Sequence, residues 1–296
     1  MNGDRIRSLL AGGEPVLMPG VYDALSVRLA ADAGFPVGFL SGYATSATLL
    51  GLPDFGYLTQ GEMADVARRV CRAAPEMAVI VDADTGYGNA LNTRRTVELF
   101  ESAGGAGIFL EDQVWPKKCG HMAGKRVVPR ADWLAKLEAA LDARRDGLFV
   151  VARTDARAAV GPGDVGLEEA IARARAAAAL GVDAIFVEAP ESVEEMRAVA
   201  EATPGMVRVA NMIEAGRTPL MTPSELHDLG FDLIVSPLTG LFAAARSLAD
   251  AYGVLAAKGS LRDDMDLLTT FDDFNRVVRL DDHYGLETRY QSPTSS

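Results

Sequence analysis

The stretch AGGAGIFLE at residues 103–111 and the stretch LGVDAIFVE at residues 180–188 contain the pattern that decides the fold. In each, a helix-forming segment ends at a glycine, and an apolar run follows that finishes in a glutamate. Glycine suits the end of a helix because it adopts positive φ without a steric clash, and a continuous apolar run suits a strand buried on both faces. Related copies follow Gly34 and Gly230. The repeat therefore predicts helices that alternate with buried strands.

Eight such strands can be placed along the chain, with helical stretches between them. The expected strands lie at 16–18, 37–41, 78–81, 108–111, 148–151, 185–188, 207–210 and 233–236, and the expected helices at 24–32, 61–72, 92–103, 131–144, 167–180, 193–202, 223–229 and 241–258. Strict alternation predicts a parallel sheet of the α/β class, and eight units favour a closed (β/α)8 TIM-type barrel. An open doubly wound sheet is the alternative, although no G-x-G-x-x-G motif follows the first strand.

Composition agrees with one large domain that acts on small molecules. Of 296 residues, 49% are hydrophobic and 24% charged, the balance of a globular protein with a sizeable core. The net charge of −12 argues against nucleic-acid and anionic-membrane partners, which need clustered positive charge. Two cysteines cannot form a disulfide framework and no secretory signal is evident, so we expect a cytoplasmic protein. The uncharged segment 33–53 is interrupted by glycines and Pro36 and predicts no membrane span.

We expect residues 1–296 to form a single barrel domain, with a C-terminal helical extension and tail at 259–296. In the extension, Leu267, Leu268, Phe271, Phe274 and Val278 recur at helical spacing. Two interpretations are open: a helix that packs on its own barrel, or one that buries its apolar stripe against another subunit.

Acidic side chains gather where the strands are expected to end, which in such barrels is where the reacting groups lie. Asp82 and Asp84 are two residues apart, so on a strand both would point into one mouth, and Glu111 ends the next strand. Close carboxylates repel unless a cation lies between them, and oxygen-only ligands favour Mg²⁺ or Mn²⁺. The alternative is that one aspartate caps the turn Asp84-Thr85-Gly86.

Cys119 lies in a polar, basic loop that follows the fourth strand. Lys117, Lys118 and His121 in this loop would favour the thiolate and bring the thiol pKa toward neutrality, as a proton-transferring cysteine requires. We therefore expect Cys119 to be exposed and reactive. Cys71, on an expected helix, fits instead the small buried hydrophobic residue that a lone cysteine usually is.

Arg153 closes an apolar strand, where an arginine is costly unless it meets an acid or an anionic ligand. We expect it to bind an anion, and the alternative is a structural ion pair with Glu188 or Asp155. The tripeptide Ser41-Gly42-Tyr43 after the second strand could present backbone N–H groups to a carboxylate, although alone it is a weak signal.

From about Leu9 to Tyr290 the chain resembles the isocitrate lyase/phosphoenolpyruvate mutase superfamily. The motifs that carry the resemblance are Leu40-Ser41-Gly42-Tyr43, Gly51-Leu52-Pro53-Asp54, Val81 to Gly88, Glu111-Asp112-Gln113, Lys117-Lys118-Cys119-Gly120-His121, Ala152 to Asp155 and Asn211 to Glu214. The Lys-Lys-Cys-Gly-His loop is similar to the lyase branches, and the phosphoenolpyruvate mutase branch has no cysteine there. The most similar branches are the 2-alkylmalate and dimethylmalate lyases, the petal death protein and the oxaloacetate hydrolases.

The resemblance implies a metal site, a substrate site and an oligomer. Mg²⁺ would be held by Asp84, with Asp82, Asp54 and Glu111 acting largely through waters. It further implies a gating loop around Cys119 and a homotetramer, a dimer of dimers that exchange the last barrel helix. The residues expected to face the substrate are Ser41, Gly42, Tyr43, Gly120, Arg153, Glu188, Asn211 and Phe242.

The expected reaction is the magnesium-dependent cleavage of a 2-hydroxy dicarboxylate to an α-keto acid and a carboxylic acid. The departing carbon must be protonated, and Cys119 is the candidate acid. Glu111 or a metal-bound water could be the base, and His121 and Arg153 complete the expected catalytic set. Alternatives are oxaloacetate hydrolysis or decarboxylation, a carboxyphosphonoenolpyruvate-type mutase, and a non-enzymatic metabolite-binding barrel.

Phe242 leads to an expectation about substrate size. The methylisocitrate-cleaving branch carries an arginine where this chain has Phe242. A third carboxylate left unpaired at this position would cost several kcal/mol, so a dicarboxylate is expected.

Overall fold

The computed structural model describes residues 2–120, 124–145, 147–161 and 164–291. It divides the chain into two compact units, residues 1–240 and residues 241–296, which are described separately. The sequence predicts one domain with an extension from residue 259, whereas the structure groups most of the last long helix with the C-terminal segment.

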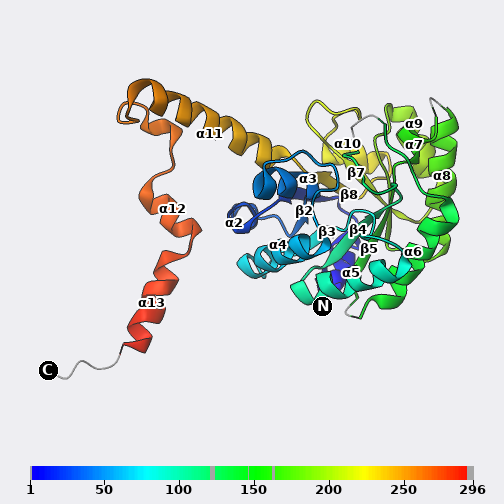
Figure 1. Ribbon diagram of the computed structural model, residues 1–296, viewed down its shortest axis with the longest axis horizontal. Helices are drawn as coiled ribbons and strands as arrows, with labels where there is room; N and C mark the ends of the chain where they lie inside the picture. The colour runs from blue at the N-terminus through cyan, green and yellow to red at the C-terminus, as the bar shows by residue number, and fades with distance from the viewer. Residues whose placement is uncertain (1, 121–123, 146, 162–163, 292–296) are drawn as a thin grey trace. The chain divides into compact units, whose positions relative to one another are not determined.

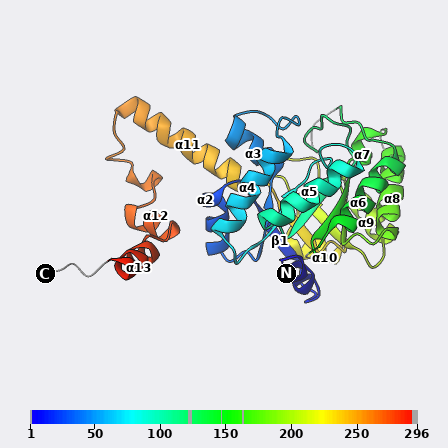
Figure 2. The same cartoon turned by 60° about the horizontal axis from the view of Figure 1, so that its bottom comes forward.

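The first unit is a closed barrel of eight parallel strands in sequential order, as predicted. Helices surround the strands (Figures 1 and 2). The barrel closes where β1 pairs with β8, in a register that joins Val16 to Leu233 and Pro19 to Ser236. The strands are β1 (Val16–Val21), β2 (Val37–Leu40), β3 (Ala78–Asp82), β4 (Gly107–Glu111), β5 (Phe149–Thr154), β6 (Ala184–Val187), β7 (Val207–Asn211) and β8 (Leu233–Ser236).

The helices of this unit follow from local capping signals. Thr59 and Glu62 form a capping box at the start of α4, and Gly104 ends α5 with a φ of 100°. The helices are α1 (Asn2–Leu10), α2 (Ala24–Asp32), α3 (Gly42–Thr45), α4 (Gln60–Ala73), α5 (Ala90–Ala103), α6 (Arg130–Ala143), α7 (Ala156–Ala159), α8 (Asp164–Ala179), α9 (Val193–Ala202) and α10 (Pro223–Asp228), with a π-helical turn η1 (Ser46–Leu50) after α3.

Alternate residues along the strands fill two separate cores. Ile80 and Phe109 belong to the cluster inside the barrel, whereas Val79 and Val81 pack against the surrounding helices. Both faces of the central strands are therefore apolar, which explains why their sequences are continuous apolar runs rather than alternating ones. Ile6 of α1 is fully buried in the inner cluster.

The second unit contains most of α11 (Thr239–Lys258), followed by a 3-10 turn η2 (Met265–Leu267), α12 (Phe271–Val277) and α13 (Leu280–Tyr290). In α11 only Ala251 is buried, and α12 and α13 have no buried residue. The stripe expected at Leu267–Val278 thus spans a 3-10 turn and a short helix, and Arg279, with a φ of 60°, separates α12 from α13. Among the described residues, no helix is long and apolar enough to cross a membrane.

Candidate active site

A cavity at the carboxyl ends of the strands brings together most of the residues that the sequence analysis selected. Its apolar wall includes Phe186, Ile213, Pro237 and Leu238. The selected residues that line it are Ser41, Tyr43, Asp54, Asp82, Cys119, Gly120, Arg153, Glu188 and Asn211. Charged and hydrophobic side chains therefore line the same cavity.

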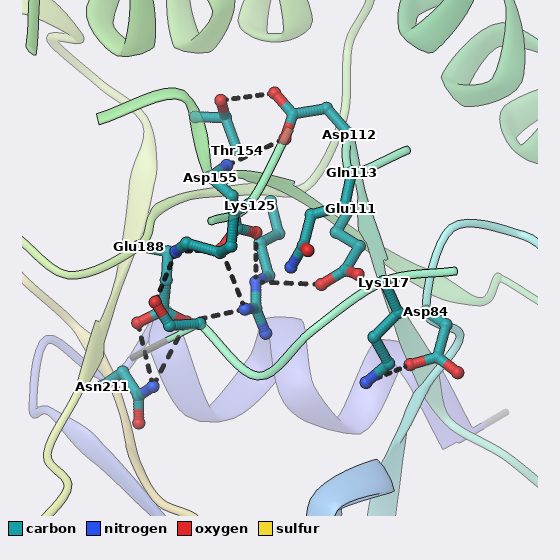
Figure 3. Close-up of polar contacts among 12 residues, drawn as sticks. Asp84, Glu111, Asp112, Gln113, Lys117, Lys125, Thr154, Asp155, Glu188 and Asn211 are labelled. Atoms are coloured by element: carbon teal, nitrogen blue, oxygen red, sulfur yellow. Dashed lines mark hydrogen bonds and ion pairs between the residues drawn. The ribbon is translucent and has the colours of Figure 1, made fainter. Parts of the chain in front are cut away.

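Lys117 lies at the centre of the acidic residues. Its Nζ atom is 2.7 Å from Oδ1 of Asp54 and 2.6 Å from Oδ1 of Asp84. Figure 3 shows the ammonium directed at Asp84. The sequence analysis assigned Lys117 to the thiol of Cys119, whereas the structure pairs its side chain, which is only 4% exposed, with the buried carboxylates.

Asp82 lines the cavity, but Asp84 does not continue strand β3 as the sequence analysis expected. Strand β3 ends at Asp82, and Asp84 has a left-handed backbone with a φ of 47°. The Asp82 carboxylate accepts the N–H of Gly42 at 3.2 Å and that of Asp84 at 3.1 Å. Asp82 therefore shapes the turn, and the turn carries Asp84 to Lys117.

The acidic cluster is short of positive charge. Burial raises the pKa of Asp84 to about 7, and the charges of Asp82 and Asp54 add to this effect while Lys117 opposes it. Burial likewise raises the pKa of Glu111 well above its usual value. Burial opposes the charge of Lys117, yet the surrounding carboxylates raise its pKa well above the usual value. The raised pKa values of these carboxyl groups indicate that an additional cation would stabilise their charged forms.

The oxygen atoms around Lys117 are of the kind that binds magnesium. Only carboxylate oxygens are offered, and Oε1 of Glu111 is buried with no hydrogen-bond partner among the described residues. Within those residues, no three acidic, histidine or cysteine side chains converge as direct ligands. Magnesium normally keeps several waters, so one direct carboxylate with others acting through water satisfies both observations. The residues present fit this ion.

Arg153 sits among three carboxylates. Its guanidinium lies 3.0 Å from Asp155, 3.1 Å from Glu188 and 3.4 Å from Glu111. The predicted alternative of a structural ion pair is therefore present, although Arg153 also lines the cavity. Asn211 donates to Glu188 at 3.2 Å, and its own Oδ1 is buried without a hydrogen bond from the described residues.

Cys119 is half-buried and lines the cavity, in the segment between β4 and α6. An isolated antiparallel bridge between Gln113 and Val127 closes the base of this loop. Burial raises the pKa of Tyr43, and the nearby Cys119 adds to the shift. His121, predicted to assist the thiol, lies outside the described residues.

Two of the predicted carboxylate binders have other partners. Ser41 caps α3 by accepting the N–H of Ala44 at 3.2 Å, and the N–H of Gly42 donates to Asp82. Phe242 lies on α11 in the second unit with 41% of its surface exposed, and its role toward the substrate stays a prediction.

The sequence analysis gave no role to Asp112 and Lys125, two buried residues behind the site. The carboxylate of Asp112 accepts the hydroxyl of Thr154 at 2.6 Å, the N–H of Asp155 at 2.8 Å and Arg173 at 3.1 Å. Lys125 is fully buried with its Nζ 2.7 Å from Asp155. Asp112 directly follows the predicted site residue Glu111, which is the signal that could have found it, whereas the sequence analysis names Asp155 only as an ion-pair partner of Arg153.

Comparison with known proteins gives consistent matches over nearly the whole chain. The profile of the family described as phosphoenolpyruvate phosphomutase matches residues 6–255. The chain is 53% identical to the chloroplastic carboxyvinyl-carboxyphosphonate phosphorylmutase of Arabidopsis thaliana, covering 94% of this chain and 81% of that protein. It is 40% identical to 2,3-dimethylmalate lyase of Eubacterium barkeri, covering 97% of each. A solved structure of oxaloacetate acetylhydrolase with the inhibitor 3,3-difluorooxalacetate has a TM-score of 0.91 at 32% identity, covering 99% of this chain and 98% of that one.

Proposed function

Because the chain belongs to the phosphoenolpyruvate phosphomutase family, we propose that it is a magnesium-dependent enzyme that cleaves a 2-hydroxy dicarboxylate of the 2-alkylmalate type. The predicted class, a carbon–carbon lyase of this superfamily, is confirmed by relatives named as lyases. The substrate, the metal and the residue roles are our proposals.

One observation carries the proposal: a thiol, a guanidinium and acidic side chains line the same cavity together with apolar side chains. Cys119, Arg153 and Asp82 all line it, and Ile213 and Leu238 form part of the hydrophobic side. A 2-alkylmalate has matching parts, since it carries two carboxylates, one hydroxyl and an alkyl group.

The reaction needs one proton removed and one supplied. The substrate hydroxyl loses its proton, its oxygen becomes the ketone of the α-keto acid, and the adjacent carbon–carbon bond breaks. The departing carbon keeps the electron pair and takes a proton from the thiol of Cys119. Arg153 and Asn211 bind a carboxylate, and the buried Oε1 of Glu111 is our candidate to accept the hydroxyl proton.

Asp84 would hold the magnesium ion, with Asp54, Asp82 and Glu111 contributing through water. When bound, the ion polarises the substrate oxygen as a Lewis acid. Lys117 now lies between Asp54 and Asp84, so its ammonium has to share or leave this position.

We also propose that the enzyme is a cytoplasmic homotetramer that exchanges α11 between subunits. The large exposed apolar side chains of α11 to α13, such as Tyr252 and Phe271, support an assembly. Sedimentation analysis of the full chain tests this assembly, and a monomer at micromolar concentration would contradict it.

The second candidate is a phosphonate mutase, and the 53% identity to the phosphorylmutase favours it. The two candidates are separated by assaying the purified chain with Mg²⁺ against 2-alkylmalates, methylisocitrate, oxaloacetate and phosphonopyruvate. Our proposal expects an α-keto acid from a 2-alkylmalate, and no turnover in EDTA. Exclusive turnover of phosphonopyruvate, or full lyase activity in EDTA, would contradict it.

A further inference from the structure

The loop that carries Cys119 is held by two buried side chains, one on each side of the cysteine. We propose that Gln113 and Lys125 are positioning residues that fix the thiol over the cavity by fastening the backbone of Lys118 and Gly120. This inference rests on the proposed role of Cys119 as proton donor.

Gln113 fastens the residue before the cysteine. Its side-chain amide donates to the carbonyl of Lys118 at 2.8 Å, and its side-chain oxygen accepts the N–H of Lys118 at 3.0 Å. Because the amide uses both its donor and its acceptor on one residue, it fixes the orientation of the Lys118 backbone as well as its position. Gln113 is 1% exposed, so water does not compete for these bonds.

Lys125 fastens the residue after the cysteine. Its Nζ donates to the carbonyl of Gly120 and lies 2.7 Å from Oδ1 of Asp155. Arg153 lies 3.0 Å from the same carboxylate, so Asp155 links the lysine to the guanidinium that lines the cavity. The lysine therefore joins Gly120 of the loop to Asp155, which follows β5. Figure 3 labels Lys125 next to Asp155.

Both side chains start from a rigid base. The N–H of Val114 donates to the backbone carbonyl of Arg126 at 2.8 Å, and the N–H of Val128 donates to the backbone carbonyl of Asp112 at 2.8 Å. Two short segments therefore pair at the base of the loop. The Asp112 carboxylate in turn accepts the N–H of Asp155 at the end of β5. The positions of Gln113 and Lys125 are therefore set by the barrel itself.

Gly120 shows why a small displacement of the loop matters. A side chain at this position would place its Cβ atom 2.6 Å from both the Arg153 guanidinium and the Glu188 carboxylate. The loop backbone thus lies directly on the ion pair that we expect to bind substrate. Holding Gly120 holds the neighbouring thiol at a fixed distance from Arg153.

The variants are Lys125→Met, Gln113→Leu and the control Arg126→Met. Lys125→Met removes the ammonium and keeps most of the apolar stem. Arg126→Met removes one charge from an exposed neighbour whose side chain makes no hydrogen bond or ion pair with the described residues. Misplacing a reacting group by about 1 Å costs about a hundredfold in rate. We expect kcat to fall by about this factor in both variants with a smaller change in KM, and little change in the control.

Two further measurements separate positioning from general damage. In a Cys119→Ala background, adding Lys125→Met should change the residual rate by less than about twofold, because the residue acts through the thiol. In a Cys71→Ser background, which leaves Cys119 as the only thiol, iodoacetamide should alkylate Lys125→Met faster than Arg126→Met. Alkylation needs no substrate, so it tests the inference even if the proposed reaction is wrong.

Equal alkylation rates in Lys125→Met and Arg126→Met would overturn the inference. A full loss of residual rate on adding Lys125→Met to Cys119→Ala would also overturn it. If Lys125→Met does not fold by circular dichroism, Gln113→Leu is tested in the same three measurements, since it buries no uncompensated charge.

Discussion

Replacing Lys117 with methionine should make the stability of the barrel depend on a divalent cation. The ammonium of Lys117 lies 2.7 Å from Asp54 and 2.6 Å from Asp84, and all three side chains are buried. Removing one partner from a buried ion pair costs about 3–5 kcal/mol, because an uncompensated charge stays inside the protein. Methionine keeps the length of the side chain but leaves the carboxylates facing one another.

The lower end of this range applies at pH 7. The pKa of Asp84 is already raised to about 7, so this group can take up a proton at a modest free-energy cost once the lysine is gone. Lys117 lowers the pKa of Asp84, so its removal raises this pKa further. A carboxyl group whose pKa is higher in the folded than in the unfolded state makes the unfolding free energy fall as pH rises toward the folded pKa. The unfolding free energy of Lys117→Met should thus lie about 3 kcal/mol below that of the wild type at pH 7. This difference should be smaller at pH 5.5 and larger at pH 8.

Urea unfolding followed by tryptophan fluorescence, in EDTA and in millimolar Mg²⁺, measures this effect. We expect Mg²⁺ to restore most of the lost free energy in Lys117→Met, since the ion supplies the missing positive charge. Lys118→Met, which removes the adjacent and less buried ammonium, should change the unfolding free energy by less than about 0.5 kcal/mol. A loss in Lys117→Met that is the same with and without Mg²⁺ would refute the idea that this cluster is a cation site.

Four further outcomes are expected. Asp84→Asn should abolish Mg²⁺ binding in calorimetry while circular dichroism shows an intact fold; unchanged affinity would remove Asp84 from the metal site. Because the pKa of Asp84 is about 7, a proton competes with the metal at low pH, and Mg²⁺ affinity should weaken about tenfold from pH 8 to pH 6. Cys119→Ser should lower kcat at least about a hundredfold, whereas Cys71→Ser should leave it nearly unchanged, and equal losses would contradict the assignment. A dicarboxylate should have a higher kcat/KM than methylisocitrate, and Phe242→Arg should narrow or reverse that preference; a wild-type preference for the tricarboxylate would contradict it.

The barrel could be predicted from the sequence because eight apolar runs alternate with helical stretches, and four of these runs follow a glycine that ends a helix. Gly104 and the run that ends at Glu111 show this directly, and the structure confirms both the helix end and the strand. Strand ends also indicated the cavity, since parallel strands deliver their last residues to one face. These patterns involve residues that are close in the sequence, so they can be recognised without knowledge of the tertiary structure.

The inner arrangement of the site could not be predicted, because it depends on contacts between distant segments. Lys117 reaches Asp54 across 63 residues of sequence, and the basic composition of its loop says nothing about that direction. The orientation of Asp84 follows from a left-handed backbone at a non-glycine residue, which sequence preferences disfavour. Helix α13 is separated from α12 by a similar exception at Arg279.

The pairing of β1 with β8 has a consequence for how the chain is made. These strands lie roughly 200 residues apart, and a ribosome that adds about 5–20 residues per second needs roughly 10–40 s to bridge that interval. Throughout this time β1 has an open edge of the kind that recruits other chains. Pro19 lies in this strand and has no N–H to donate to a foreign strand. Strand β1, which closes the barrel with β8, thus contains a residue that disfavours pairing with other chains during synthesis.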